Sequence, residues 1–130
     1  MHFDDIVILY ASQTGTAEDV SRHMFRQLST CYKNGRVQLF SCDEYLGEKK
    51  DDTDGHCLVL IVCSTTGNGD PPENSRFFWR YVMSRRFDPA TLFGTRKSIH
   101  YAILGLGDSS YERFNFTFTQ LYHSENLNQV

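Results

Sequence analysis

The chain has 130 residues, with 13 Lys+Arg, 16 Asp+Glu and a formal net charge of −3. Its length predicts one domain, because domains cluster near about 100–150 residues. Its longest apolar runs fall far short of the ~20 residues that cross a bilayer, so no membrane span is expected. The acidic balance argues against a general nucleic-acid surface, which needs a basic stripe, and leaves room for a basic protein partner.

The cysteines and histidines predict neither a disulfide framework nor a metal site. Cys31, Cys42, Cys57 and Cys63 form no CxxC pair, and the last two lie within an apolar run. We therefore expect reduced thiols, with Cys57 and Cys63 filling the core. The histidines lack the spacing of zinc ligands, and metal sites are not expected. The first five residues do not resemble a signal peptide, so the expected compartment is the cytoplasm.

The first half of the chain alternates strand and helix patterns. Residues 6–10 form a continuous apolar run, typical of a strand buried on both faces of a parallel sheet. A second strand is expected over residues 37–40, and the charged residues 43–55 predict a loop with at most one helical turn. Between the strands, apolar side chains at spacings of three and four residues predict a helix with one apolar face: Ala17, Val20, Met24, Leu28 and Cys31.

The second half repeats this alternation. Residues 57–63 give the strongest strand pattern, and residues 98–104 predict a fourth strand. Between them, residues 74–84 predict a helix whose single apolar face carries four side chains: Phe77, Phe78, Tyr81 and Val82. Strands that alternate with helices predict βαβ units and an α/β fold with a doubly wound parallel sheet.

Three of the predicted strands run into polar turns that contain glycine, and ligands of open α/β sheets bind beyond the carboxyl ends of the strands. The first turn precedes a helix, where hydroxyl groups, backbone N–H groups and a glycine can hold a phosphate monoester. It has no lysine, unlike the nucleotide-binding loop GxxxxGK[ST]. Its candidate residues are Ser12, Gln13, Thr14, Gly15, Thr16 and Ala17.

The other two turns suit a flat ligand. In the second, Gly67 and Gly69 permit positive φ, so that backbone amides can turn toward a ring; its candidate residues are Ser64, Thr65, Thr66 and Gly67. In the third, glycines allow close approach and Tyr111 offers a stacking ring. Its candidate residues are Leu104, Gly105, Leu106, Gly107, Asp108, Ser109, Ser110, Tyr111, Glu112 and Arg113. Together the turns predict one site for flavin mononucleotide (FMN).

Each turn has an ordinary structural interpretation when it is taken alone. A Ser/Thr-rich turn before a helix is usually an N-cap, and Gly-Asn-Gly is usually a tight turn. The stretch from Gly105 to Ser110 is not the dinucleotide fingerprint GxGxxG, because Ser110 replaces its third glycine. The occurrence of all three turns at one sheet edge favours the ligand site.

Three stretches make the chain resemble the flavodoxin-like FMN domain of the diflavin reductases. They are SQTGTAEDVS at 12–21, STTGNGDPPEN at 64–74 and LGLGDSSYERFNF at 104–116. The resemblance covers about residues 5–116 and implies a flavodoxin-like sheet with strand order 2-1-3-4-5. Within the family, the chain most resembles the cytosolic members that supply electrons to iron–sulfur assembly.

The resemblance implies an electron-transfer role. NADPH would give a hydride to FAD in a separate domain, FAD would pass single electrons to FMN, and FMN would deliver them to a protein acceptor of iron–sulfur assembly. It implies that residues 12–17 hold the phosphate, that residues 64–67 line the isoalloxazine and that residues 104–113 flank it, with Tyr111 stacking. It implies no catalytic acid, base or nucleophile, because the flavin carries the chemistry.

After Asn115 the sequence departs from the family pattern. We expect a shortened FMN domain over residues 1–116 and a divergent polar tail over residues 117–130, without the fifth strand and final helix of the family fold. The FAD and NADPH domains would lie in the parent reductase, so this chain alone would not oxidise NADPH. A stand-alone flavodoxin-like electron carrier and a shortened form without function remain alternatives. A phosphate-binding hydrolase is disfavoured, because no CxxxxxR loop is present.

Overall fold

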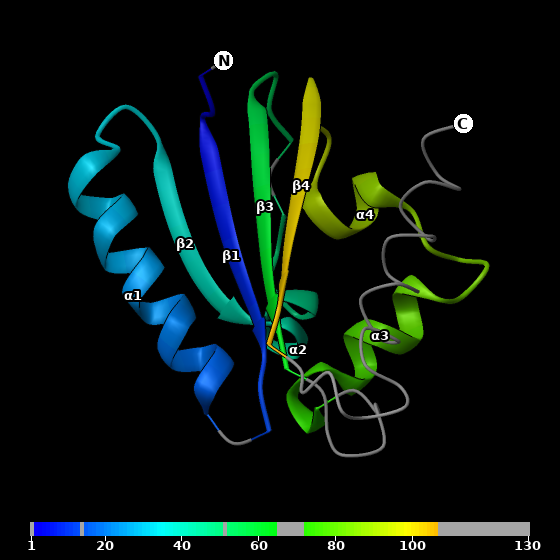
Figure 1. Ribbon diagram of the computed structural model, residues 1–130. Coiled ribbons are helices and arrows are strands. Elements are labelled where there is room, and N and C mark those ends of the chain that lie inside the picture. Colours follow the sequence, from blue (N-terminus) through cyan, green and yellow to red (C-terminus); the bar gives the residue numbers. More distant parts are fainter. Residues whose placement is uncertain (1, 14, 51, 65–71, 107–130) are drawn as a thin grey trace.

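The computed structural model describes residues 2–13, 15–50, 52–64 and 72–106. Four parallel strands form one sheet in the order β2-β1-β3-β4 (Figure 1). The strands are β1 (Asp5–Ala11), β2 (Arg36–Ser41), β3 (His56–Cys63) and β4 (Ser98–Gly105). The predicted α/β fold is confirmed, and so is the predicted order of its first four strands.

Strand β1 is the centre of the sheet. All seven of its residues are buried, as the continuous apolar run predicts. It pairs with β2 on one side and with β3 on the other, both in parallel. Among the described residues, β4 pairs with β3 alone and forms an edge of the sheet.

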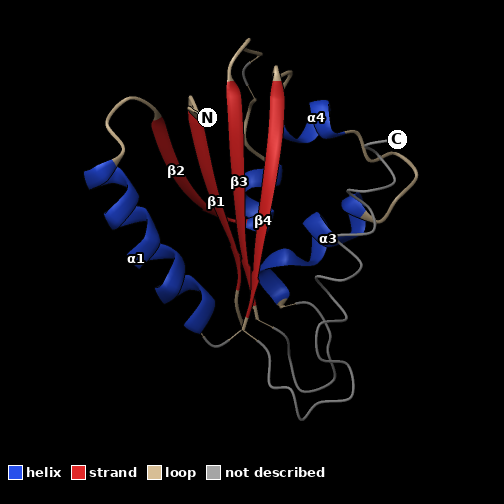
Figure 2. Cartoon of the chain, turned by 45° about the horizontal axis from the view of Figure 1, so that its top comes forward, coloured by secondary structure: helices blue, strands red, loops and turns tan. Residues whose placement is uncertain are grey.

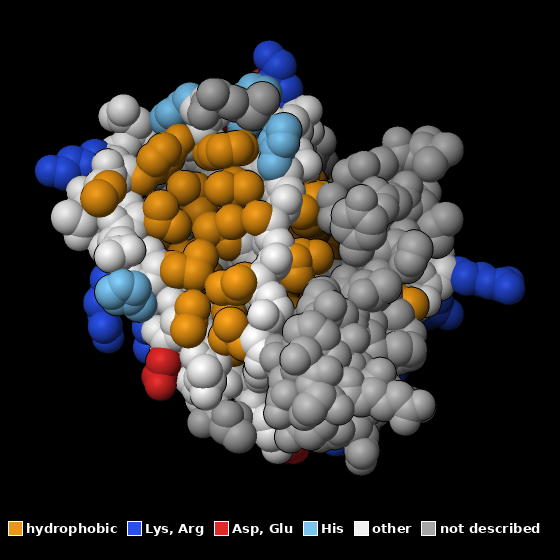
Figure 3. Space-filling view, in the orientation of Figure 1, with side chains coloured by type: hydrophobic (Ala, Val, Ile, Leu, Met, Phe, Trp, Pro, Cys, Tyr) orange, Lys and Arg blue, Asp and Glu red, His pale blue; other side chains and the backbone are white. Residues whose placement is uncertain are grey.

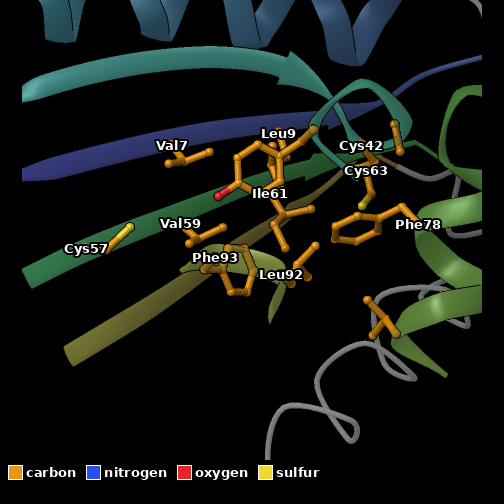
Figure 4. Packing of buried hydrophobic residues seen from close by; sticks show 13 residues of the cluster. Val7, Leu9, Cys42, Cys57, Val59, Ile61, Cys63, Phe78, Leu92 and Phe93 are labelled. Carbon is orange, nitrogen blue, oxygen red and sulfur yellow. The ribbon is translucent and has the colours of Figure 1, made fainter. Parts of the chain in front are cut away.

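The helices cover the two faces unequally. Helix α1 (Thr16–Cys31) packs on β1 and β2 from one side. The opposite face carries the main core, which joins alternate residues of β1 and β3 to α2 (Cys42–Leu46), α3 (Arg76–Val82) and α4 (Pro89–Phe93). Figure 2 shows this arrangement from a second direction, and Figure 4 shows Phe78, Leu92 and Phe93 packed against Val59 and Ile61.

The predicted elements outside the sheet differ in detail from the structure. Helix α2 begins one residue before the predicted loop and is little longer than the single helical turn expected there; a capping box between Ser41 and Glu44 starts it. Helix α4 is not predicted, because five residues carry too little periodicity; Asp88 caps it and Pro89 opens it. The helix predicted over 74–84 is divided into a 3₁₀ turn, η1 (Glu73–Ser75), and the shorter α3.

The predicted single apolar face of α3 is also wrong. Phe78 and Val82 are buried, but the side chain of Phe77 is 60% exposed. Phe78 and Val82 occupy the core, with Trp79 and Tyr81 packed beside them, and Phe77, about 100° from Phe78 around the helix, lies on the other side. Phe77 instead lies on the surface of the molecule.

A buried charge cluster joins the amino ends of the strands. The carboxylate of Asp5, at the start of β1, accepts hydrogen bonds from Arg36 Nε at 3.1 Å and from Arg96 Nη1. Arg96 is almost fully enclosed, with 3% of its side chain exposed, whereas Arg36 is half exposed. Arg96 also donates from Nε to the carbonyl of Phe93 at 3.1 Å. This cluster connects β1, β2 and the turn that precedes β4.

Part of the sheet face beside α1 is open in the described structure. Leu58 and Leu60 of β3 are half-buried there, and Ala102 and Leu104 of β4 are exposed. Figure 3 shows hydrophobic side chains gathered over the strands on this side.

Among the described residues, none of the helices has both the length and the apolar composition of a membrane span.

Candidate functional site

Three strands end at the same level, which brings the three predicted turns to one edge. Ala11 of β1 is in register with Cys63 of β3, and Cys63 is in register with Gly105 of β4. The ladder continues one residue further, because Ser64 N–H donates to the Ala11 carbonyl at 2.9 Å and Leu106 N–H donates to the Cys63 carbonyl at 2.7 Å. The start of each turn is therefore fixed by the backbone of its neighbour.

The first turn leaves the N-terminus of α1 open to an anion. Gly15 is the N-cap residue, with φ 95° and ψ −8°, a left-handed conformation that favours glycine. The Ser12 hydroxyl accepts a hydrogen bond from Gly15 N–H at 2.8 Å and so closes the turn. Among the described residues, no side chain caps the N-terminus of α1. Its first N–H groups are therefore available to a ligand.

The electrostatics of this turn come from the backbone. Residues 12–17 contain no Lys or Arg, and the first turn of α1 carries Glu18 and Asp19. Glu18 is paired with Arg22, whose Nε lies 2.9 Å from its carboxylate. Ala17 is fully buried and has no polar side-chain atom, so it offers an anion no side-chain contact. An anion here would be held by N–H groups and the positive end of the helix dipole.

Two side-chain amides connect the first turn to the segment that follows the second turn. Ser12 N–H donates to Asn74 Oδ1 at 3.0 Å, and Glu73 N–H donates to Gln13 Oε1 at 3.3 Å. The role of Gln13 in holding the ligand stays a prediction; in the structure its amide oxygen accepts a hydrogen bond from η1. Asn74 was not predicted as a site residue, and its position in the STTGNGDPPEN stretch is the one sequence signal for it.

The remaining predicted residues divide into described and undescribed ones. Ser64 is buried, and its hydroxyl donates to the Ala11 carbonyl at 3.2 Å, so it stabilises the strand ends. Leu104 is exposed at the end of β4 and Leu106 is half-buried. The following predicted site residues lie outside the described residues: Thr14, Thr65, Thr66, Gly67, Gly107, Asp108, Ser109, Ser110, Tyr111, Glu112 and Arg113.

Groups beneath this edge are neutral at pH 7. Burial raises the pKa of the Cys63 thiol to about 12 and raises the pKa of the neighbouring Cys42 thiol well above its ordinary value. Burial, with a smaller contribution from Glu18 and Glu44, also raises the pKa of Tyr10. The floor of the site therefore offers packing surface and backbone hydrogen bonds. Within the described ranges, no group of three His, Cys, Asp or Glu residues could hold a metal ion.

A polar cavity of about 120 Å³ lies elsewhere, along β2, and is a weaker candidate. Three of its four basic lining residues have partners among the described residues, and the fourth, Lys49, is exposed. Arg36 and Arg96 share Asp5, and Lys50 donates to the Tyr45 carbonyl and lies over the Tyr45 ring, 4.0 Å from its centroid. This cavity takes no lining residue from the turns that follow β1, β3 and β4, where ligands of open α/β sheets bind.

Comparison with known proteins agrees with this geometry. The flavodoxin family model matches residues 8–123. The chain is 40% identical to NADPH-dependent diflavin oxidoreductase 1 of Xenopus laevis over 97% of its own length, and 35% identical to that of Schizosaccharomyces pombe over 89%. It spans less than a fifth of these relatives, 19% and 18% of their respective lengths.

Solved flavodoxins share the fold. A cysteine-to-alanine variant of flavodoxin from Pseudomonas aeruginosa superposes with a TM-score of 0.61 at 25% identity, over 97% of this chain and 77% of that one. A variant of Fusobacterium nucleatum flavodoxin bound to flavin mononucleotide gives a TM-score of 0.65 at 17% identity, over 97% and 65%. The family match over most of the sequence, the strand order and the open turn before α1 agree, and the chain belongs to the flavodoxin family.

Proposed function

We propose that the chain binds FMN at the carboxyl edge of its sheet and acts as the electron-transfer module of an NADPH-dependent diflavin oxidoreductase. The observation that carries this proposal is the uncapped N-terminus of α1, preceded by Gly15 at φ 95°. A phosphate monoester fits there, because the turn presents N–H groups and nothing described lies within 4 Å of a Cβ position at Gly15.

Different described residues would contact different parts of the cofactor. The N–H groups at the exposed start of α1, beginning with Thr16, would bind the phosphate, while Ser12 and Asn74 hold the turn in shape. The strand ends at Ala11, Cys63 and Gly105 would form the floor beneath the ring system. When bound, FMN supplies the redox chemistry, since a flavin accepts and donates electrons singly or in pairs.

The rest of the proposed pathway lies outside this chain. The similarity to NADPH-dependent diflavin oxidoreductase 1 supports a parent protein in which NADPH reduces FAD, FAD reduces FMN and FMN reduces a protein acceptor. We propose a cytosolic iron–sulfur assembly protein as this acceptor. The 130-residue chain would supply the last carrier before that acceptor.

The direct test is FMN binding by the chain of residues 1–130, with riboflavin as the matched control. We expect quenched flavin fluorescence and at least about 100-fold tighter binding of FMN than of riboflavin, because riboflavin lacks the phosphate and its charge-assisted hydrogen bonds. Equal affinities for the two flavins would contradict the phosphate site. If the chain does not bind FMN, the result favours the alternative that it is a shortened form without function.

A stand-alone electron carrier is the second candidate. It is favoured by the fold, because the chain superposes on the Pseudomonas aeruginosa flavodoxin with a TM-score of 0.61 at 25% identity. The two candidates differ in their electron donor. We expect the FMN-loaded chain to be reduced faster by NADPH through the FAD-containing remainder of the Xenopus laevis relative than through a bacterial ferredoxin–NADP⁺ reductase. The opposite order would favour the stand-alone carrier.

A further inference from the structure

Residues 76–87, which comprise α3 and the residues directly after it, form a strongly basic segment within an acidic chain. Residues 76–87 contain four of the 13 basic residues and no Asp or Glu, although the whole chain has a net charge of −3. All four arginines of this segment are exposed: Arg76, Arg80, Arg85 and Arg86. None of them forms an ion pair with another described residue. Their positive charge is therefore uncompensated in the described structure.

An exposed aromatic ring lies within this basic surface. Phe77 projects outward, and the Arg80 guanidinium lies over its ring, 5.7 Å from the centroid. The opposite side of α3 is fixed, because Phe78 and Val82 are buried and Phe78 N–H donates to Asp43 Oδ1 at 2.8 Å. The Phe77 ring is thus presented by a helix that the core holds in place.

This surface begins beside the candidate FMN site. Asn74 and Glu73, which form hydrogen bonds to the first turn, immediately precede α3 in the chain. Figure 1 shows α3 starting next to the carboxyl ends of the strands. A partner bound over Arg76 and Phe77 would therefore lie near the ligand-binding edge.

We propose that Arg76, Phe77 and Arg80 of α3, here named the arginine surface, dock an acidic protein segment that carries an apolar side chain, with Arg85 and Arg86 adding positive charge further along the chain. Uncompensated arginines around an exposed aromatic residue match the composition of interface hot spots, and opposite charge steers the encounter. That this segment belongs to the electron acceptor rests on the proposed function. A nucleic acid is disfavoured, since the chain is acidic overall and the surface is centred on an apolar ring.

The test uses the 130-residue chain and a fluorescein-labelled peptide of about ten residues in which Glu alternates with Leu. Fluorescence anisotropy is measured with and without FMN, for the wild type, for Arg76→Glu/Arg80→Glu and for Phe77→Ser. The matched control is Arg26→Glu/Lys33→Glu, which makes the same charge change at exposed positions in and after α1. A peptide with Ser in place of Leu tests the apolar contribution.

We expect Arg76→Glu/Arg80→Glu to weaken peptide binding about tenfold or more and Phe77→Ser to weaken it several-fold, with the control unchanged. FMN affinity should stay as in the wild type, which separates this proposal from the FMN proposal. If the double variant does not fold by circular dichroism, Arg76→Gln/Arg80→Gln replaces it. Equal peptide binding by all variants would overturn the proposal, and so would tighter arginine-dependent binding of oligo(dT) or of anionic phosphatidylserine vesicles.

Discussion

At the scale of single residues, Asp5 has the largest expected effect on stability. Its buried carboxylate pairs with two arginines, of which Arg96 is almost completely enclosed. We expect Asp5→Ala to lower the free energy of unfolding by about 3–5 kcal/mol, because the substitution leaves a buried guanidinium without its counter-charge. Urea denaturation measures the change.

The control for Asp5→Ala is Glu18→Ala, which removes the exposed i,i+4 partner of Arg22. That substitution should cost less than about 1 kcal/mol, because solvent screens exposed pairs. Similar losses for the two variants would contradict the assignment of Asp5 as a buried structural charge.

The four cysteines should differ in reactivity. Cys31 is exposed, whereas Cys42, Cys57 and Cys63 are buried. Burial raises the pKa of the Cys57 thiol to about 11 and that of Cys63 to about 12, so these thiols remain protonated at pH 8. We expect iodoacetamide to alkylate Cys31 alone in the folded protein and all four cysteines in urea, as measured by mass spectrometry. Modification of Cys63 in the folded state would contradict the described packing.

Replacement of Gly15 tests whether its left-handed backbone conformation matters for stability and for FMN binding. No described atom would meet a Cβ at this position, so the cost of Gly15→Ala comes from its φ of 95° and is about 1 kcal/mol of stability. We also expect weaker FMN binding, because relaxation of Gly15 moves the N–H groups at the start of α1. Gly47→Ala is the control, since Gly47 has φ −84° and right-handed geometry. Equal effects of the two substitutions would argue against a strained phosphate-binding turn.

At the scale of elements, the connection between η1 and the first turn should affect ligand binding more than folding. Asn74→Ala removes the acceptor of Ser12 N–H and should weaken FMN binding about tenfold, since a partly buried donor loses its partner and the turn loses its shape. Asn74→Ser, with a shorter acceptor, should recover part of the affinity. Isothermal calorimetry measures both, and an unchanged affinity for Asn74→Ala would remove Asn74 from the site.

The elements also show how far sequence patterns predict the structure. Strand β1 was predictable because burial on both faces gives a continuous apolar run, and helix α1 because apolar side chains recur at helical spacing. The predicted apolar face of α1 is only partly buried, and Cys31 at its end is exposed. Helices α2 and α4 have five residues each and depend on caps at Ser41 and Asp88, which leave no periodicity to detect. At the candidate site, the open turn before α1 agrees with its glycine and hydroxyl residues, whereas the role of Asn74 depends on a contact across 62 positions of the sequence.

At the scale of the whole molecule, stability should decrease from the centre of the sheet to its edge. Strand β1 is paired on both sides and fully buried, whereas β4 pairs with β3 alone among the described strands and alternates between half-buried and exposed residues. We expect the amides of Ile8 and Leu9 to show the slowest hydrogen exchange and those of Ala102 and Ile103 to exchange faster. Equal protection of β1 and β4, measured by NMR, would indicate that β4 is covered in solution.

Because the strands are parallel, the residues that stabilise the fold and those that we assign to ligand binding lie at opposite ends of the sheet. The aspartate–arginine cluster lies at the amino ends of the strands, and the turns that we assign to the cofactor lie at the carboxyl ends, with the apolar core between them. Selection for a durable fold and selection for a ligand or partner therefore act on different residues. The binding end can diverge through many substitutions while the amino end keeps the scaffold intact, which makes this sheet a suitable framework for redesigned flavin sites.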